Sequence, residues 1–415
     1  MQAEQDWRAF QREHLFFTWS EQANASGLEI TDAQGARFKV AGKGWVWDLE
    51  SQVYNVNIGH RHTHVQARMV AQIQELPACA PHAVIPIRAR LAELLTEVTG
   101  LHCAFLSTGG SEAVENAIKM ARMVTGRSKI VTRRNSYHGA SLAVLGIAGD
   151  SRKDPFTADL APAYHIEDEL PVREASAQQA SNWLESFQAL LEREGAQTIA
   201  AVLLEGLTGT NGMQTPPQDF WLGVRALCDQ HGILLIDDEI FSGFGRTGKW
   251  FAREHWGVRV DMMTIGKGLT SGYAPLAGVM VSEAIAKHFA DHKLWCGLTH
   301  YAHPVSCAAA VGAIEVTRDE RLVENAEKLG DQLEAGLRRL MQTYACMREL
   351  RGMGLMRGIV FDRECRGLAK ILWEKGAYVP FRDEMLFLCP PLCLQAAECE
   401  QILQTMEDSL ALWSE

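Results

Sequence analysis

The sequence lacks any apolar run near the roughly 18 to 20 residues of a membrane-spanning helix, so we expect no membrane span. Its polar start, MQAEQDWR, has no basic segment followed by an apolar one, and no secretory signal is expected. It also lacks a cluster of Lys and Arg, and its net charge is −11. Because the phosphate backbone requires a basic surface, we expect no nucleic-acid partner.

Cysteine is sparse as well. Ten cysteines among 415 residues are too few for a disulfide scaffold, and none forms a C-x-x-C pair. We therefore predict reduced, mostly buried thiols in a cytoplasmic protein. His60, His62 and His64 alternate, but no acid or cysteine lies at a fitting spacing, so we interpret them as structural and expect no metal.

The composition, 47% apolar and 22% charged, is typical of a soluble globule of two to three domains. Short aliphatic and β-branched runs lie at 103–107, 129–132, 199–204, 232–236, 262–265 and 277–281. They do not alternate with polar residues, which is typical of strands covered on both faces and predicts a mostly parallel sheet. Helical patterns between them predict an α/β domain.

The two ends of the chain differ from this middle region. Glycines and tryptophans at 26–50 predict a small antiparallel meander, whereas 308–340 predicts one helix. We predict three parts, namely an N-terminal segment, 1–60, that contributes to a small domain, a large α/β domain, 61–310, and a C-terminal α+β domain, 311–415.

A glycine turn follows one predicted strand, in the position where open α/β sheets bind ligands. In STGGSEA, 107–113, Gly109 and Gly110 let the backbone approach closely, and the free N–H groups of the helix start suit a phosphate. A turn without any ligand is the alternative. The segment is neither G-x-G-x-x-G nor G-x-x-x-x-G-K-[ST], which disfavours a dinucleotide or a nucleoside triphosphate.

Three further features could carry chemistry. Asp237, Asp238 and Glu239 end a buried strand, where they indicate a cap or ion pair, or an acid that holds a proton on a ligand or binds a metal. Lys267 lies between glycines after another strand, and partial burial would lower its pKa towards that of a nucleophile, a solvated lysine being the alternative. Tyr137 either stacks on a planar ring or only packs.

Together, a phosphate cradle, an aromatic platform, a buried acid and a lysine nucleophile are what pyridoxal phosphate requires. The lysine amine bonds to the aldehyde of this cofactor, and the acid keeps the pyridine nitrogen protonated. A released lysine is then a natural general base for a 1,3-proton shift.

With these motifs the sequence resembles a class III aminotransferase, of the ω-amino-acid type, among the fold-type I pyridoxal-phosphate-dependent enzymes. The resemblance covers about residues 25–410 and implies a three-layer α/β fold with a mostly parallel central sheet and a smaller α+β domain. The best-matched stretches are GGSEAVENAIKMAR (109–122), YHG (137–139), DDEIFSGFGRTG (237–248), GKGLTSGYAPLAG (266–278), THYAHPVSCAAA (299–310) and RGMGLMRGIVF (351–361).

The resemblance implies roles around the cofactor ring. Asp238 bonds the pyridine nitrogen, Ile240 packs under the ring, and Lys267 forms the covalent bond to the aldehyde. Tyr137 stacks on the ring, with His138 beside it.

The resemblance also implies a phosphate site. Gly110 and Ser111 hold the phosphate, Thr299 reaches the phosphate of a neighbouring subunit, and Glu205 lies near the site. Because such sites are completed by two subunits, a homodimer or homotetramer with shared active sites is implied.

The substrate pocket is implied by position. Phe17 and Trp19 stand where relatives have aromatic pocket residues, and Gln52 and Tyr54 lie in the matching stretch DLESQVYN. Arg382 stands near the family's mobile arginine, which would bind an acceptor carboxylate, a solvated arginine being the alternative.

The implied reaction is a ping-pong transamination from an amine or ω-amino acid to pyruvate or 2-oxoglutarate. A β-amino acid or a taurine-like donor is favoured by FFTWSEQ and NVNIGH. An aminomutase or an amino-acid racemase on the same scaffold is the alternative. The family often has Gln where this chain has Phe241, so a contact to the ring hydroxyl is lost or water-mediated.

Overall fold

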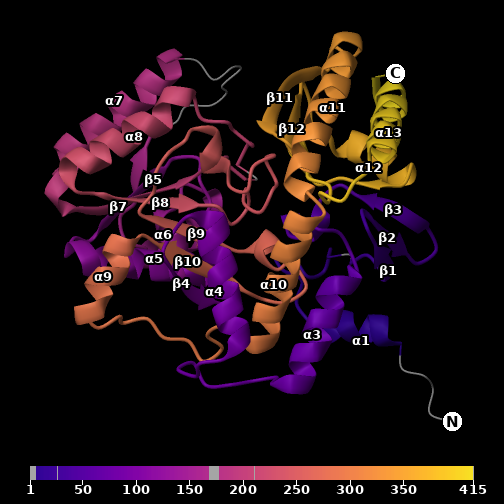
Figure 1. Ribbon diagram of the computed structural model, residues 1–415. Helices are drawn as coiled ribbons and strands as arrows, with labels where there is room; N and C mark the ends of the chain where they lie inside the picture. Colours follow the sequence, from indigo (N-terminus) through magenta and orange to yellow (C-terminus); the bar gives the residue numbers. More distant parts are fainter. Residues whose placement is uncertain (1–5, 26, 168–176, 210, 415) are drawn as a thin grey trace.

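The computed structural model describes residues 6–25, 27–167, 177–209 and 211–414, and a seven-stranded sheet forms its centre (Figure 1). Its order is β4-β10-β9-β8-β7-β5-β6, and each neighbouring pair is parallel except the two made by β10. The strands are β4 Cys103–Ser107, β5 Lys129–Arg133, β6 Tyr164–Ile166, β7 Ile199–Glu205, β8 Leu234–Asp238, β9 Met262–Ile265 and β10 Ala277–Val281. The predicted mostly parallel sheet is confirmed, and β6 is the strand that the sequence did not indicate.

Helices cover both faces of this sheet (Figure 1). The helices are α1 Trp7–His14, α2 Ser51–Tyr54, α3 Thr63–Glu75, α4 Pro86–Thr99, α5 Gly110–Thr125, α6 Leu142–Ile147, α7 Ala177–Glu194, α8 Gln218–His231, α9 Glu283–Asp291, α10 Pro304–Asp319, α11 Leu322–Thr343, α12 Arg366–Glu374 and α13 Ala396–Ser414, with 3₁₀ turns at Ser151–Asp159, Ala196–Thr198, Ala252–His255 and Lys267–Leu269. Successive strand residues point to opposite faces. In β7, Val202 and Leu204 accordingly share a buried cluster with α7 and α8, whereas Ala201 and Leu203 share one with α5. The three-layer α/β fold is thus confirmed.

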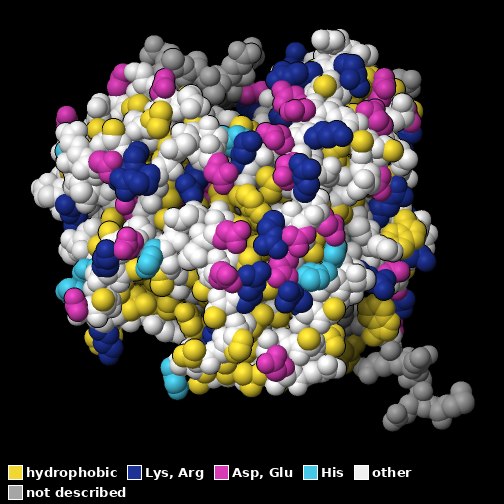
Figure 2. All heavy atoms as spheres, viewed as in Figure 1, with side chains coloured by type: hydrophobic (Ala, Val, Ile, Leu, Met, Phe, Trp, Pro, Cys, Tyr) yellow, Lys and Arg dark blue, Asp and Glu magenta, His cyan; other side chains and the backbone are white. Residues whose placement is uncertain are grey.

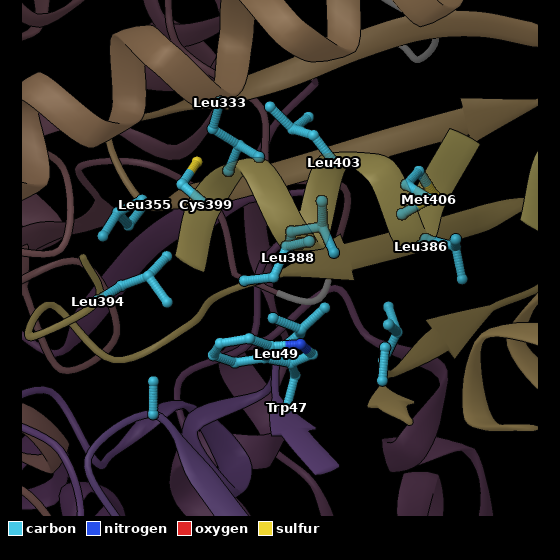
Figure 3. Close-up of a cluster of buried hydrophobic side chains, with 14 of the residues drawn as sticks. Trp47, Leu49, Leu333, Leu355, Leu386, Leu388, Leu394, Cys399, Leu403 and Met406 are labelled. Carbon is cyan, nitrogen blue, oxygen red and sulfur yellow. The ribbon is translucent and has the colours of Figure 1, made fainter. Parts of the chain in front are cut away.

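The two ends of the chain meet in smaller sheets. β1 Ile30–Gln34, β2 Arg37–Val40 and β3 Gly44–Asp48 form the expected antiparallel meander, and β13 Ala377–Tyr378 pairs with β3 in parallel. A second antiparallel sheet consists of β11 Met347–Met353, β12 Met356–Phe361, β15 Met385–Leu388 and β14 Phe381–Arg382. Trp47 and Leu49 of the N-terminal part share one apolar cluster with Leu333 and Leu403 of α11 and α13 (Figure 3). The division at residues 60 and 310 stays a prediction, and residue 310 lies inside α10.

The single helix expected at 308–340 is wrong, because two helices, α10 and α11, share this region. Arg321 has φ 55°, a left-handed conformation that separates them. Neither glycine nor proline marks the break, so it has no signal in the amino-acid composition.

None of the described helices has both the length and the apolar character needed to cross a membrane. On the face shown in Figure 2, Lys and Arg side chains are interspersed with Asp and Glu.

One buried arginine ties the C-terminal part to the large sheet. Arg246 is fully buried, and its guanidinium donates to Asn57 Oδ1 at 2.8 Å and to the carbonyl oxygen of Pro390. The backbone N–H of Leu355 donates to the carbonyl of Arg246 at 3.0 Å. Beside it, Gly354 has φ +54°, and a Cβ there would lie 2.5 Å from the backbone carbon of Thr247. Only glycine fits this contact without moving the backbone.

We predict that Gly354→Ala lowers the free energy of unfolding of the apoprotein by about 3 kcal/mol, because backbone strain and overpacking add. Gly42→Ala is the matched control, since Gly42 also has a left-handed φ of +73° but nothing within 4 Å of a Cβ. It is expected to cost about 1 kcal/mol. Denaturant unfolding measures both, and equal losses would contradict the packing argument.

Candidate active site

A cavity of about 310 Å³ lies where β7, β8 and β9 end and α5 begins, within the size range of small-molecule sites. All predicted cofactor-binding residues except Thr299 line it, namely Gly110, Ser111, Tyr137, His138, Glu205, Asp238, Ile240 and Lys267. The carboxyl ends of parallel strands thus bring together residues that are far apart in the sequence.

Lys267 follows β9 with φ 42°, an uncommon conformation for a residue other than glycine. Burial lowers the pKa of its amine from 10.5 to about 8, although the charges of Asp238 and Glu205 act in the opposite direction. Nζ lies 4.5 Å from the ring centre of Phe241 and 5.7 Å from that of Tyr54. An amine with this pKa is partly unprotonated near neutral pH, as a nucleophile must be.

Asp238, the last residue of β8, is fixed by three hydrogen bonds. Oδ1 accepts from Thr264 Oγ1 at 2.9 Å and from the Ile240 N–H at 3.2 Å, and Oδ2 accepts from Nδ1–H of His138 at 2.7 Å. Burial opposes a charge on His138, but the hydrogen bond and charge of Asp238 outweigh it and raise the pKa of the imidazole. A carboxylate has about four lone-pair sites, so Asp238 keeps room for one more donor.

Glu205, at the end of β7, holds two loops of the site. Oε1 accepts from the backbone N–H of Tyr137 at 3.1 Å, and Oε2 accepts from that of Gly209 at 2.7 Å. Burial raises the pKa of this carboxyl. Glu205 therefore fixes the turn that carries the tyrosine expected to stack on a ring.

The N-terminus of α5 forms one end of the cavity. A Cβ at Gly110 would lie 3.0 Å from Ile240 Cδ1, so glycine allows the helix to start against this side chain. A Cβ at Gly109 would meet nothing within 4 Å, which leaves the approach to the helix end open. The first N–H groups of a helix have no intrahelical partner and suit an anion.

These features fit pyridoxal phosphate. The open helix end with Ser111 would hold its phosphate, and Asp238 has the remaining acceptor for its ring nitrogen. Tyr137 and Ile240 would contact the ring, and Lys267 supplies the amine.

The lining of this cavity includes neither Thr299 nor any of the five predicted substrate residues, Phe17, Trp19, Gln52, Tyr54 and Arg382. Thr299 is exposed. Arg382 is exposed, donates to Asn211 Oδ1 at 3.1 Å, and lines a separate cavity of about 570 Å³ between the large sheet and the C-terminal sheet.

The other predicted substrate residues are placed unevenly. Tyr54 is buried and packs edge-on against Phe241, with ring centres 4.6 Å apart. Gln52 is partly buried and donates to Asp48 Oδ2 at 3.3 Å. Trp19 is 63% exposed, whereas Phe17 is partly buried near Gly27.

Arg152 is a further candidate that was not among the residues predicted from the sequence. Its guanidinium carbon lies 3.5 Å from the ring centre of Tyr137 and 5.3 Å from that of Trp19. Asp150 holds it through two hydrogen bonds of 2.7 and 2.9 Å. No motif surrounds Arg152, so only the fold shows its position.

Comparison with known proteins gives a consistent result. The model of the family described as Aminotransferase class-III matches residues 19–410. The acetylornithine aminotransferase of Methanothermobacter thermautotrophicus is 33% identical over 88% of this chain and 91% of its own. The taurine–pyruvate aminotransferase of Rhodobacter capsulatus is 30% identical over 92% and 90%. Among solved structures, the taurine:2-oxoglutarate aminotransferase of Bifidobacterium kashiwanohense, in complex with PLP and glutamate, has a TM-score of 0.93 at 31% identity, covering 97% of this chain and 96% of that one.

The fold, the cavity and these relatives define a pyridoxal-phosphate-dependent aminotransferase. The chain belongs to the class III aminotransferase family.

The lowered pKa of Lys267 predicts how the apoprotein captures its cofactor. The rate at which added pyridoxal phosphate develops its protein-bound visible absorbance should rise with pH and level off above about 8, because only the unprotonated amine attacks the aldehyde. Stopped-flow spectroscopy measures this profile, and Lys267→Arg is the control without a nucleophile. A rate that still climbs at pH 10 would contradict the proposed burial of the amine.

Proposed function

We propose that this aminotransferase moves the amino group of an amine or ω-amino acid, with taurine-like and β-amino donors included, to pyruvate or 2-oxoglutarate in a ping-pong cycle. The observation that carries the proposal is one cavity lined by Lys267, Asp238 and the start of α5. The likeness to a taurine–pyruvate aminotransferase and to a taurine:2-oxoglutarate aminotransferase supports the donor and acceptor classes.

Asp238 and Lys267 have separate roles in the proposed reaction. When bound, pyridoxal phosphate supplies an electron sink for a carbanion on the substrate. Asp238, held by Thr264 and His138, would accept a hydrogen bond from the ring nitrogen. The Nζ of Lys267, with a pKa of about 8, takes a proton from the substrate carbon and delivers it to the second carbon of the 1,3-proton shift.

Arg152 is the cation that we propose for the acid group of the substrate. It lies on Tyr137, which lines the cavity, and near Trp19, a predicted pocket residue. Its bidentate contact with Asp150 fixes the guanidinium. Arg382, the arginine proposed from the sequence, is the competing candidate.

We also propose that two or four copies share active sites in the cytoplasm. Thr299 is exposed and outside the cavity of its own chain, as expected for a residue that reaches a partner. All ten cysteines are free, in keeping with a reducing compartment.

A half-reaction screen tests the substrate classes. Candidate amines mixed with cofactor-loaded protein should bleach its visible absorbance, with taurine and β-alanine among the active donors. Pyruvate or 2-oxoglutarate should then restore the band. The proposal would be contradicted if neither taurine-like nor β-amino donors bleached the band. It would also be contradicted if one substrate were interconverted without use of a keto acid.

Arg152→Gln should raise KM for acidic substrates by about thirtyfold, because a hydrogen bond to a charged group contributes about 2 kcal/mol. KM for a neutral amine should change little. Arg382→Gln is the matched comparison in the same steady-state assay. If only Arg382→Gln raises KM for acidic substrates, Arg382 and not Arg152 binds the acid group of the substrate.

A further inference from the structure

A chain of three side chains leads from the proposed phosphate site along α5. Ser111 Oγ lies 2.7 Å from Ser141 Oγ, and Ser141 Oγ donates to Glu115 Oε1 at 2.7 Å. The backbone N–H of Ser141 donates to Ser111 Oγ at 3.0 Å. Gly139 allows this approach, since a Cβ there would lie 2.5 Å from Ser111 Oγ.

The direction of the protons follows from the number of donors. Each serine hydroxyl has one proton to donate, and a carboxylate only accepts. Because Ser141 donates to Glu115, the contact between the two hydroxyls uses the proton of Ser111. The Ser111 proton is therefore directed at Ser141 and not at an anion on the helix end.

We propose that Glu115 is a positioning residue that loosens the hold on the cofactor phosphate by directing the proton of Ser111 towards Ser141. A phosphate oxygen must compete with Ser141 for that proton. The site is thereby set for reversible binding of the phosphate. The inference rests on the proposed role of Ser111 as a phosphate ligand.

Glu115→Gln tests the inference with cofactor release as the readout. The amide of Gln donates to Ser141 Oγ, whose proton then turns to Ser111 and frees the Ser111 proton for the phosphate. Release of pyridoxal phosphate, followed by its visible absorbance after dilution into a scavenger, should slow by about tenfold. Pyridoxal, which has no phosphate, should bind the variant and the parent protein equally.

Glu112→Gln is the matched control. Like Glu115→Gln, it removes one negative charge from α5, here from the first turn. Glu112, however, accepts from Thr108 and does not contact Ser141. It should slow release much less than Glu115→Gln does. An equal effect would mean that charge alone acts, which overturns the proton-direction argument.

Ser141→Ala provides a second route if Glu115→Gln fails to fold. It removes the acceptor of the Ser111 proton, so release should slow, and adding Glu115→Gln to this background should change nothing further. Faster release in Ser141→Ala, or unchanged release in a Glu115→Gln protein whose apo form melts like the parent, overturns the inference.

Ser111→Ala separates this inference from the proposal beneath it. If Ser111→Ala binds pyridoxal phosphate as tightly as the parent, the Ser111 hydroxyl is no phosphate ligand, and both the inference and the role proposed for that hydroxyl fail. If Ser111→Ala weakens binding while Glu115→Gln leaves release unchanged, only the inference fails.

Discussion

Removal of the Lys267 amine from water is the interaction on which the site depends. Burial lowers the pKa of this amine to about 8, while the nearby carboxylates of Asp238 and Glu205 oppose the shift. A more exposed lysine would stay protonated at neutral pH and could not attack an aldehyde. The fold must therefore bring acids close enough to bind a cofactor, yet keep the amine dry against Phe241 and Tyr54.

Strand register meets this demand. Asp238 pairs with Thr264 across β8 and β9, so the hydroxyl that fixes the carboxylate comes from the strand that leads into Lys267. His138 reaches the same carboxylate from the loop after β5. Arg246, bonded to Asn57 and Pro390, holds the N-terminal and C-terminal parts against the site. Backbone pairing of β8 with β9 thus sets the positions of Asp238 and Lys267. Packing between distant segments forms the walls of the cavity around them.

The sequence predicted those features of the structure that depend on residues close together in the chain. Apolar runs marked the long central strands, and the residues that follow them, such as Asp238 and Lys267, were found because strand ends converge in a parallel sheet. Arg152 was missed because its position on Tyr137 depends on tertiary packing alone. The break at Arg321 was missed because a left-handed arginine has no compositional signal. Thr299 lies outside the cavity of its own chain, so its role towards a partner subunit stays a prediction.

The covalent attachment of the cofactor to Lys267 is the central claim, and chemical trapping tests it most directly. Cofactor-loaded protein is reduced with borohydride, digested and mapped by mass spectrometry. We expect the mass of the reduced cofactor on the peptide that contains Lys267, and on no other lysine. An unmodified Lys267 peptide, or a label on a different lysine, would contradict it.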